Sequence, residues 1–340
     1  METKKRIGYI DAIRGFTMIL VVYAHICHFC LGDSRLGFNA VFILFRLPCF
    51  FMLSGWLFQP VAQRPFADVA RHKAMVQLVP TFIFLFLLAG PSMFFYQLGT
   101  YKGGYWFTFA LFEFFILYML VERAGRRWSV VLALLLTLVS FSYDSYRHQF
   151  FTSPHFSFSD VLGFLSFPVW RFFFFFYIGA WMRRHFEAFI KWTDKPVAFL
   201  AITVVFFYVS STPHFPKPWF EIFRFYIGGI TGMWLVFTCF RKLYSHPSIR
   251  NSVSSIFHIP STVLRFIGTR TLDIYLLHYF FLPRFLISYS GQLKANDSQV
   301  VEFFFILAVS LCVLSLSLLS SYLIRLSPFL AHYLFGVKRE

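Results

Sequence analysis

Charged residues are scarce in this chain. Asp, Glu, Lys and Arg together make up 14% of its 340 residues, whereas 58% are hydrophobic and the mean hydropathy is +0.65. A soluble domain usually carries about a quarter of its residues as charged groups. No polar stretch is long enough to form a second domain, so the sequence predicts one integral membrane domain over residues 1–340.

Acidic residues are scarcer still, with 15 Asp and Glu against 31 Lys and Arg, which gives a formal net charge of +16. A nucleic acid or another acidic partner would account for such a charge. In a membrane protein, however, excess positive charge marks the cytoplasmic loops. We therefore expect the bilayer, and no nucleic acid, as the partner of this chain.

Cysteine is also rare, and all five cysteines lie in or beside apolar segments: Cys27, Cys30, Cys49, Cys239 and Cys312. This placement is typical of small buried hydrophobic residues rather than of a disulfide framework. The Cys27–Cys30 pair has no second pair, and a helix would spread it and the neighbouring histidines around its axis, so we expect no metal site. The chain also lacks an internal repeat, a glycine-rich phosphate loop and the small-residue cleavage site of a removed signal peptide.

Long apolar runs dominate what remains, and ten of them are long enough to cross a bilayer as helices. They lie at about 8–30, 38–58, 75–98, 105–121, 128–146, 160–182, 196–212, 219–240, 266–286 and 299–324. If the N-terminus is cytoplasmic, loops rich and poor in Lys and Arg alternate along the whole chain. The expected fold is therefore all-α, with about ten transmembrane helices and cytoplasmic N- and C-termini. The phenylalanine run at 172–176 is expected to face lipid or to pack between helices.

The first span carries Asp11, Arg14 and His25 in an otherwise largely apolar run. Such groups are costly in hydrocarbon and usually face a protein interior or a wet cavity. Arg14 and His25 are eleven residues apart, so they differ by only ~20° around a helix and by roughly 16 Å along it. One face of this helix should therefore present a charge at one level and an imidazole at another.

Other polar groups inside spans also need partners. Arg46, Glu113, Arg171 and His278 are the candidates. Glu113 with Arg46 or Arg171 would form a buried ion pair that fixes helix register. His278, expected near the middle of a helix, would either hydrogen-bond across helices or serve the site. Ser54 is a candidate nucleophile, although no motif near it would activate it, and its other role is packing.

Three stretches resemble the motifs of the integral-membrane acyltransferases called acyltransferase family three. They are DAIRG at 11–15 followed by His25, LPCFFMLSG at 47–55, and Gly268 followed by LDIYLLH at 272–278. The resemblance covers nearly the whole length of the chain. It departs at 71–80, where many members carry two arginines three residues apart and this chain has Arg71 and Lys73 instead. We expect this chain to act without the extracytoplasmic hydrolase-like domain that some members carry.

The resemblance implies an enzyme of the bacterial inner membrane that transfers an acyl group, usually acetyl, from acyl-CoA to a hydroxyl of an extracytoplasmic sugar or glycan. His25 would be the general base, Arg14 would stabilise donor charge or the thioester oxyanion, and Asp11 would orient Arg14. Five residues would bind substrate: His278, Arg46, Glu113, Ser54 and Tyr275. Arg71 and Lys73 would bind the phosphates of the donor, and a partner acyltransferase protein could complete the transfer.

A transporter or exporter of a glycan or lipid-linked sugar is the alternative, because intramembrane Arg, Glu and His also line such paths. No inverted repeat or pair of interrupted helices is evident in the sequence, and these are features of many transporters. The sequence leaves open the acceptor and the length of the acyl group.

Overall fold

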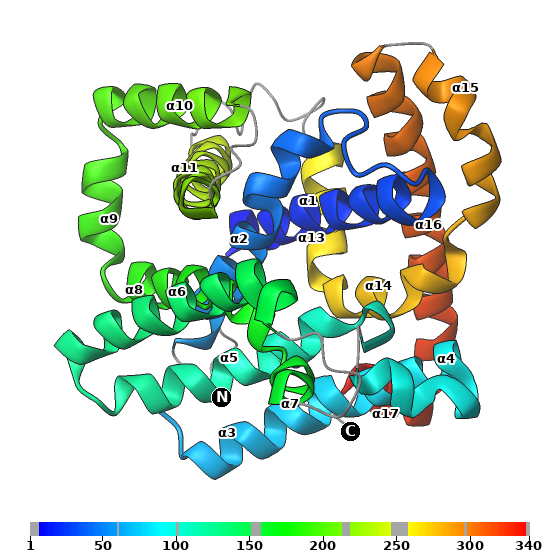
Figure 1. The fold of residues 1–340 in the computed structure, drawn as a ribbon, viewed down its shortest axis with the longest axis horizontal. Helices are drawn as coiled ribbons and strands as arrows, with labels where there is room; N and C mark the ends of the chain where they lie inside the picture. The colour runs from blue at the N-terminus through cyan, green and yellow to red at the C-terminus, as the bar shows by residue number, and fades with distance from the viewer. Residues whose placement is uncertain are drawn as a thin grey trace. The chain divides into compact units, whose positions relative to one another are not determined.

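The computed structural model describes residues 7–59, 61–99, 102–150, 158–212, 218–245, 258–295 and 298–337. Every regular element in these ranges is a helix (Figure 1). The all-α prediction is therefore confirmed for the described part of the chain. The stretch His214–Lys217 and the basic residues of both chain ends, on which part of the loop-charge prediction depended, lie outside it.

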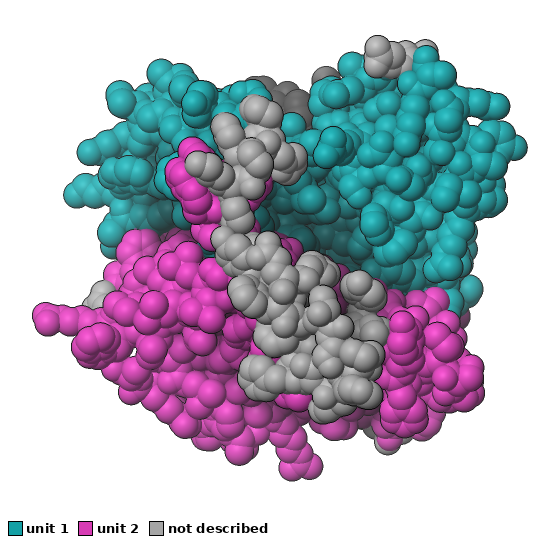
Figure 2. All heavy atoms as spheres, viewed as in Figure 1, with its two compact units in different colours: residues 1–50, 187–213, 223–323 teal, residues 51–186, 214–222, 324–340 magenta. Residues whose placement is uncertain are grey.

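The chain divides into two compact units, coloured separately in Figure 2. Unit 1 comprises residues 1–50, 187–213 and 223–323, and unit 2 comprises 51–186, 214–222 and 324–340. The chain passes between the units several times, and four of the boundaries fall inside helices: Asn39–Phe58, Phe186–Thr193, Pro218–Ser245 and Gln299–Arg325. Each unit is described by itself below.

Unit 1 contains long apolar helices that match runs predicted to cross the membrane, together with shorter helices and turns. They are α1 (Gly8–His25), η1 (Ile26–Cys30), the first part of α2 (Asn39–Phe58), α9 (Phe186–Thr193), α10 (Pro196–Ser211), α11 (Pro218–Ser245), α13 (His258–Thr269), α14 (Thr271–Leu277), η5 (His278–Phe281), η6 (Arg284–Tyr289), α15 (Ser290–Ala295) and α16 (Gln299–Arg325).

Unit 2 contains the remaining helices and the phenylalanine run. They are α3 (Phe66–Lys73), η2 (Ala74–Leu78), α4 (Val79–Gly99), η3 (Lys102–Gly104), α5 (Trp106–Glu122), α6 (Arg126–Phe150), α7 (Phe158–Phe164), η4 (Phe167–Phe172), α8 (Phe173–Arg184) and α17 (Pro328–Phe335). Phe173, Phe175 and Phe176 are wholly buried, so the run packs between helices.

Six helical stretches in the described residues are long and apolar enough to cross a membrane, or seven if the bent pair α9–α10 counts as one. Of the other predicted spans, α5 is intact but has only 17 residues. The predicted spans at 160–182 and 266–286 are not continuous helices. Ser166, in the left-handed region with φ 51°, and Pro168 interrupt the first, and Arg270 and Pro283 interrupt the second. Hydropathy detects the apolar run but not these interruptions, which depend on local backbone angles.

Glycines bring two pairs of helices into backbone contact. A Cβ on Gly15 of α1 would lie 2.0 Å from the carbonyl oxygen of Leu264, and one on Gly268 of α13 would lie 1.8 Å from that of Asp11. In unit 2, Gly55 of α2 and Gly179 of α8 are in similar contact with Phe176 and Met52. Small residues allow such close approach, and in a bilayer van der Waals packing drives helix association.

We expect Gly15→Ala to destabilise unit 1, because the added methyl group meets backbone that cannot rotate away. The loss should be at least about 2 kcal/mol, which is within the range for overpacking in a close-packed interior. Gly291→Ala is the matched control, since nothing lies within 4 Å of the Cβ that it would add. Thermal unfolding of both variants in detergent measures the difference, and equal midpoints would contradict the helix contact.

Candidate active site

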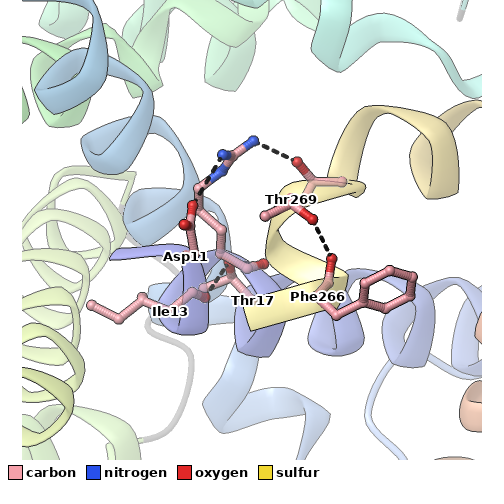
Figure 3. Close-up of polar contacts among 7 residues, drawn as sticks. Asp11, Ile13, Thr17, Phe266 and Thr269 are labelled. Carbon is pink, nitrogen blue, oxygen red and sulfur yellow. Dashed lines mark hydrogen bonds and ion pairs between the residues drawn. The ribbon is translucent and has the colours of Figure 1, made fainter. Parts of the chain in front are cut away.

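The site in unit 1 is built along α1, whose first turn carries Asp11. An Asp11 carboxylate oxygen lies 3.7 Å from a guanidinium nitrogen of Arg14, and another nitrogen of Arg14 donates a hydrogen bond of 2.7 Å to the Thr271 hydroxyl of α14. Figure 3 shows that the neighbouring hydroxyls of Thr17 and Thr269 turn back instead to carbonyl oxygens of their own helices. Arg14 therefore provides a polar link between α1 and α14 at this level.

The imidazoles of His25 and His278 meet at the other end of α1. Nδ1 of His25 lies 2.7 Å from Nε2 of His278. The ring centres are 4.9 Å apart and the ring planes differ by 9°. The distance between the ring centres equals the nitrogen–nitrogen distance plus the distance from each of these nitrogens to its own ring centre. The two rings therefore lie end to end in nearly one plane. His278 is wholly buried, whereas His25 is partly exposed.

Arg14 and His25 therefore face the same segment of the chain, as the helical spacing predicts. Arg14 contacts Thr271 and His25 contacts His278. The partners are seven residues apart, which again returns to within ~20° on a helix. His278 does not lie near the middle of a helix, because α14 ends at Leu277 and a 3-10 turn follows. Sequence reasoning did not assign Thr271, although it lies within the third motif.

A π-helical turn directly follows His25, and a second one follows Lys73. Such wide turns are rare and occur frequently at functional sites. Both π-helical turns follow a candidate residue of the sequence analysis. Apolar periodicity in the sequence does not reveal such turns.

Arg46 lies close enough to His25 for its positive charge to act on the imidazole. Its guanidinium donates a 2.6 Å hydrogen bond to the Asn39 side-chain oxygen, and the Asn39 amide donates one of 2.7 Å to the Ser34 carbonyl oxygen. Among the described residues, no carboxylate lies within ion-pair distance of Arg46. Arg46 is therefore a partly buried cation that an amide orients without neutralising it.

The loop at 31–38 is held to the end of unit 1 that carries the histidines. The Gly37 N–H donates a 2.8 Å hydrogen bond to the buried carboxylate of Glu302, and the Tyr23 hydroxyl donates one to the Gly37 carbonyl oxygen. Gly37 has φ +50°, and a Cβ there would lie 2.4 Å from the Tyr23 oxygen.

The same loop is also held by Asp33, which forms an ion pair of 3.2 Å with Lys294. The hydrogen bond from the Arg35 N–H, and to a smaller extent Lys294, holds the pKa of Asp33 below its usual value. Sequence analysis missed the parts played by Tyr23 and Glu302.

The remaining predicted acid, Glu113, lies in unit 2 and accepts a 2.7 Å hydrogen bond from the Trp170 indole. The predicted ion pair of Glu113 with Arg46 or Arg171 is wrong, since Arg171 pairs with Asp144 and Arg46 bonds Asn39. Asp144, near the end of the predicted span at 128–146, was not among the candidates from the sequence. Lys102 is buried in the same unit, and its amine donates to the Gly163 carbonyl oxygen.

The other candidates of the sequence analysis differ in exposure. Arg71 is exposed, whereas the Lys73 amine lies 4.2 Å from the centre of the Phe115 ring and 5.6 Å from that of Phe58.

Two of the predicted substrate-binding residues lie in different surroundings. Ser54 is partly buried beside Gly55 in α2. Tyr275 is buried, with its ring centre 5.8 Å from that of His278. Cys27, Cys30 and Cys49 are buried as expected, but Cys239 and Cys312 are exposed.

Chemically, the unit 1 site combines a partly exposed imidazole, a second imidazole hydrogen-bonded to it, and a guanidinium whose charge acts on the first imidazole. This combination is suited to moving a proton and stabilising negative charge. Within the described ranges, no group of three His, Cys, Asp or Glu side chains is arranged to hold a metal ion.

Several apolar helices and a polar site built on the first of them are features of a multi-pass membrane protein. The chain belongs to acyltransferase family three, because the family model described as an acyltransferase domain matches residues 7–326. No curated protein and no solved structure matches it.

Replacing Trp170 with Phe should destabilise unit 2 by about 1.5–3 kcal/mol, since the Glu113 side chain would lose the hydrogen bond that Trp170 donates to it. Trp128→Phe is the control in the same unit, because Trp128 is 65% exposed. Chemical or thermal unfolding in detergent compares the two. A Trp170→Phe variant as stable as the control would show that this bond contributes nothing.

Proposed function

We propose that this chain is an O-acyltransferase of the bacterial inner membrane. It moves an acyl group, in the first instance acetyl, from acyl-CoA to a hydroxyl of an extracytoplasmic sugar or glycan. The observation that carries the proposal is the hydrogen-bonded His25–His278 pair, with the Arg46 charge acting on His25, in a chain whose family is that of acyltransferases.

The proposed topology has ten spans in one membrane domain, with both termini cytoplasmic. The six long apolar stretches, the bent pair α9–α10, α5 and the two interrupted segments together account for the ten. Interrupted backbone is tolerated at membrane depth where protein buries it or where it lines a wet cavity. The interruption after α14 coincides with His278, which supports a polar interior there.

In the proposed reaction His25 takes the proton of the acceptor hydroxyl as the oxygen attacks the thioester carbonyl carbon. The carbon–sulfur bond then breaks, and the proton passes from His25 to the departing CoA thiolate. The products are an ester and free CoA, so atoms and charges balance. No metal takes part in this scheme.

Arg46 is the better placed of the two arginines to stabilise the oxyanion, because its charge acts on His25. Arg14 is bonded to Asp11, on the side away from His25, and lies roughly 16 Å from His25 along α1. We therefore assign Arg14, oriented by Asp11, to donor charge. Arg71 and Lys73 would bind the CoA phosphates, and Tyr275, Ser54 and Glu113 would contact substrate. The proposal also includes a partner acyltransferase protein that completes the transfer to the acceptor.

Transport of a glycan is the competing function, and the interrupted helices remove one sequence argument against it. The family match favours acyl transfer. Detergent-purified chain supplied with radiolabelled acetyl-CoA and membranes from the producing cells should release CoA and label a product. Movement of glycan without CoA release would contradict the proposal. Mass spectrometry of surface glycans from cells with and without the chain would identify the acceptor.

His25→Gln should lower CoA release in this assay by about 10²- to 10⁴-fold, the usual contribution of a general base. His185→Gln is the control, because His185 is only partly buried, lies in unit 2, and has its Nδ1 3.0 Å from the carbonyl oxygen of Trp181. A folded His25→Gln protein with undiminished acyl transfer would exclude His25 as the base.

Arg46→Gln should reduce kcat by about 10²- to 10³-fold with little change in KM, as is typical when one oxyanion donor is lost. Arg14→Gln should instead raise KM for acetyl-CoA. The exposed Arg35, changed to Gln, controls for loss of charge near the site. Steady-state kinetics separate the two roles, and a kcat effect confined to Arg14→Gln would reverse the assignment.

A further inference from the structure

The hydrogen bonds of His278 determine which of its nitrogens carries a proton. Its Nδ1 lies 3.0 Å from the carbonyl oxygen of Ile274. A carbonyl oxygen only accepts hydrogen bonds, so Nδ1 must be the donor. In a neutral imidazole the other nitrogen, Nε2, then has a lone pair and accepts.

His278 is neutral for a physical reason. It is wholly buried, the Arg46 charge acts on its partner His25, and no carboxylate among the described residues pairs with it. A buried cation without a counter-charge is strongly disfavoured. Two protonated nitrogens 2.7 Å apart would also repel each other, so a single proton lies between the rings.

That proton belongs to Nδ1 of His25, because Nε2 of His278 is an acceptor. Since His25 is then protonated on Nδ1, its own Nε2 has the free lone pair. Nε2 of His25 forms no hydrogen bond with the described residues. It is also not among the fully buried polar atoms that lack a partner, so it is not fully buried. It is therefore accessible to a molecule that enters the site.

We propose that His278 is a positioning residue whose hydrogen bonds, from the Ile274 carbonyl through both rings, hold His25 in the tautomer that presents Nε2 as the base. The catalytic part of this inference rests on the proposed function, whereas the tautomer does not. When Nε2 takes the acceptor proton, His25 becomes a cation and still donates from Nδ1 to His278. That hydrogen bond strengthens as charge develops, so it stabilises the transition state more than the ground state.

The bond geometry identifies a matched pair of variants. In His278→Gln the side-chain oxygen falls near the position of Nε2 and can accept from His25. In His278→Ala nothing replaces the acceptor. His332→Gln is the control, since His332 also bonds a backbone carbonyl, that of Val337, but in the other unit.

The first test is nitrogen NMR of the detergent-purified full chain with isotope-labelled histidine, in which the His25 signals are those lost in His25→Gln. We expect Nδ1 protonated and Nε2 unprotonated in the natural chain and in His278→Gln, and a mixture of tautomers in His278→Ala. A natural chain with Nε2 of His25 protonated would overturn the proposal.

The second test is the rate of CoA release from acetyl-CoA. His278→Ala should lower kcat about 10- to 100-fold with KM unchanged, while His278→Gln should stay within about threefold of the natural chain. Equal losses in two folded variants would overturn the positioning role. A natural chain that has the expected tautomer but releases no CoA would contradict the proposed function and leave the tautomer assignment standing.

Discussion

The contact of α1 with α13 through Gly15 and Gly268 is the constraint on which the rest of unit 1 depends. At this contact the backbones touch, because a Cβ on Gly15 or Gly268 would lie 2.0 or 1.8 Å from the facing carbonyl oxygen. The chain then turns at Arg270 and runs beside α1, which places Thr271 opposite Arg14 and His278 opposite His25. A wider separation of the helices would break both polar contacts, because each has the length of a single hydrogen bond.

The polar groups of this chain are arranged so that most of them satisfy one another inside an apolar protein. Thr17 and Thr269 bond their own helices, Glu302 holds the loop at Gly37, and Glu113 bonds Trp170. Against this background Nε2 of His25 stands out, because the described residues leave it without a hydrogen bond while its ring is fixed from the other side. Fixing one nitrogen and leaving the other accessible is what a reactive imidazole requires.

Secondary structure followed the sequence where apolar runs were long and uninterrupted, as in α1 and α16. It departed from the prediction where single residues changed the backbone. Ser166 in the left-handed region and Arg270 at a helix break each divide a predicted span, and hydropathy is insensitive to both. The π-turn after His25 was likewise beyond prediction, because it changes hydrogen bonding without changing composition.

By itself, the sequence determined the membrane class, the shared face of Arg14 and His25, and the family, since hydropathy, helical period and motif order are local or linear properties. Tertiary structure alone decided three partners: His278 for His25, Trp170 for Glu113 and Asp144 for Arg171. A hydrogen bond depends on direction and on distances of about 3 Å. Such distances between residues far apart in the chain follow from helix packing, which no linear pattern specifies.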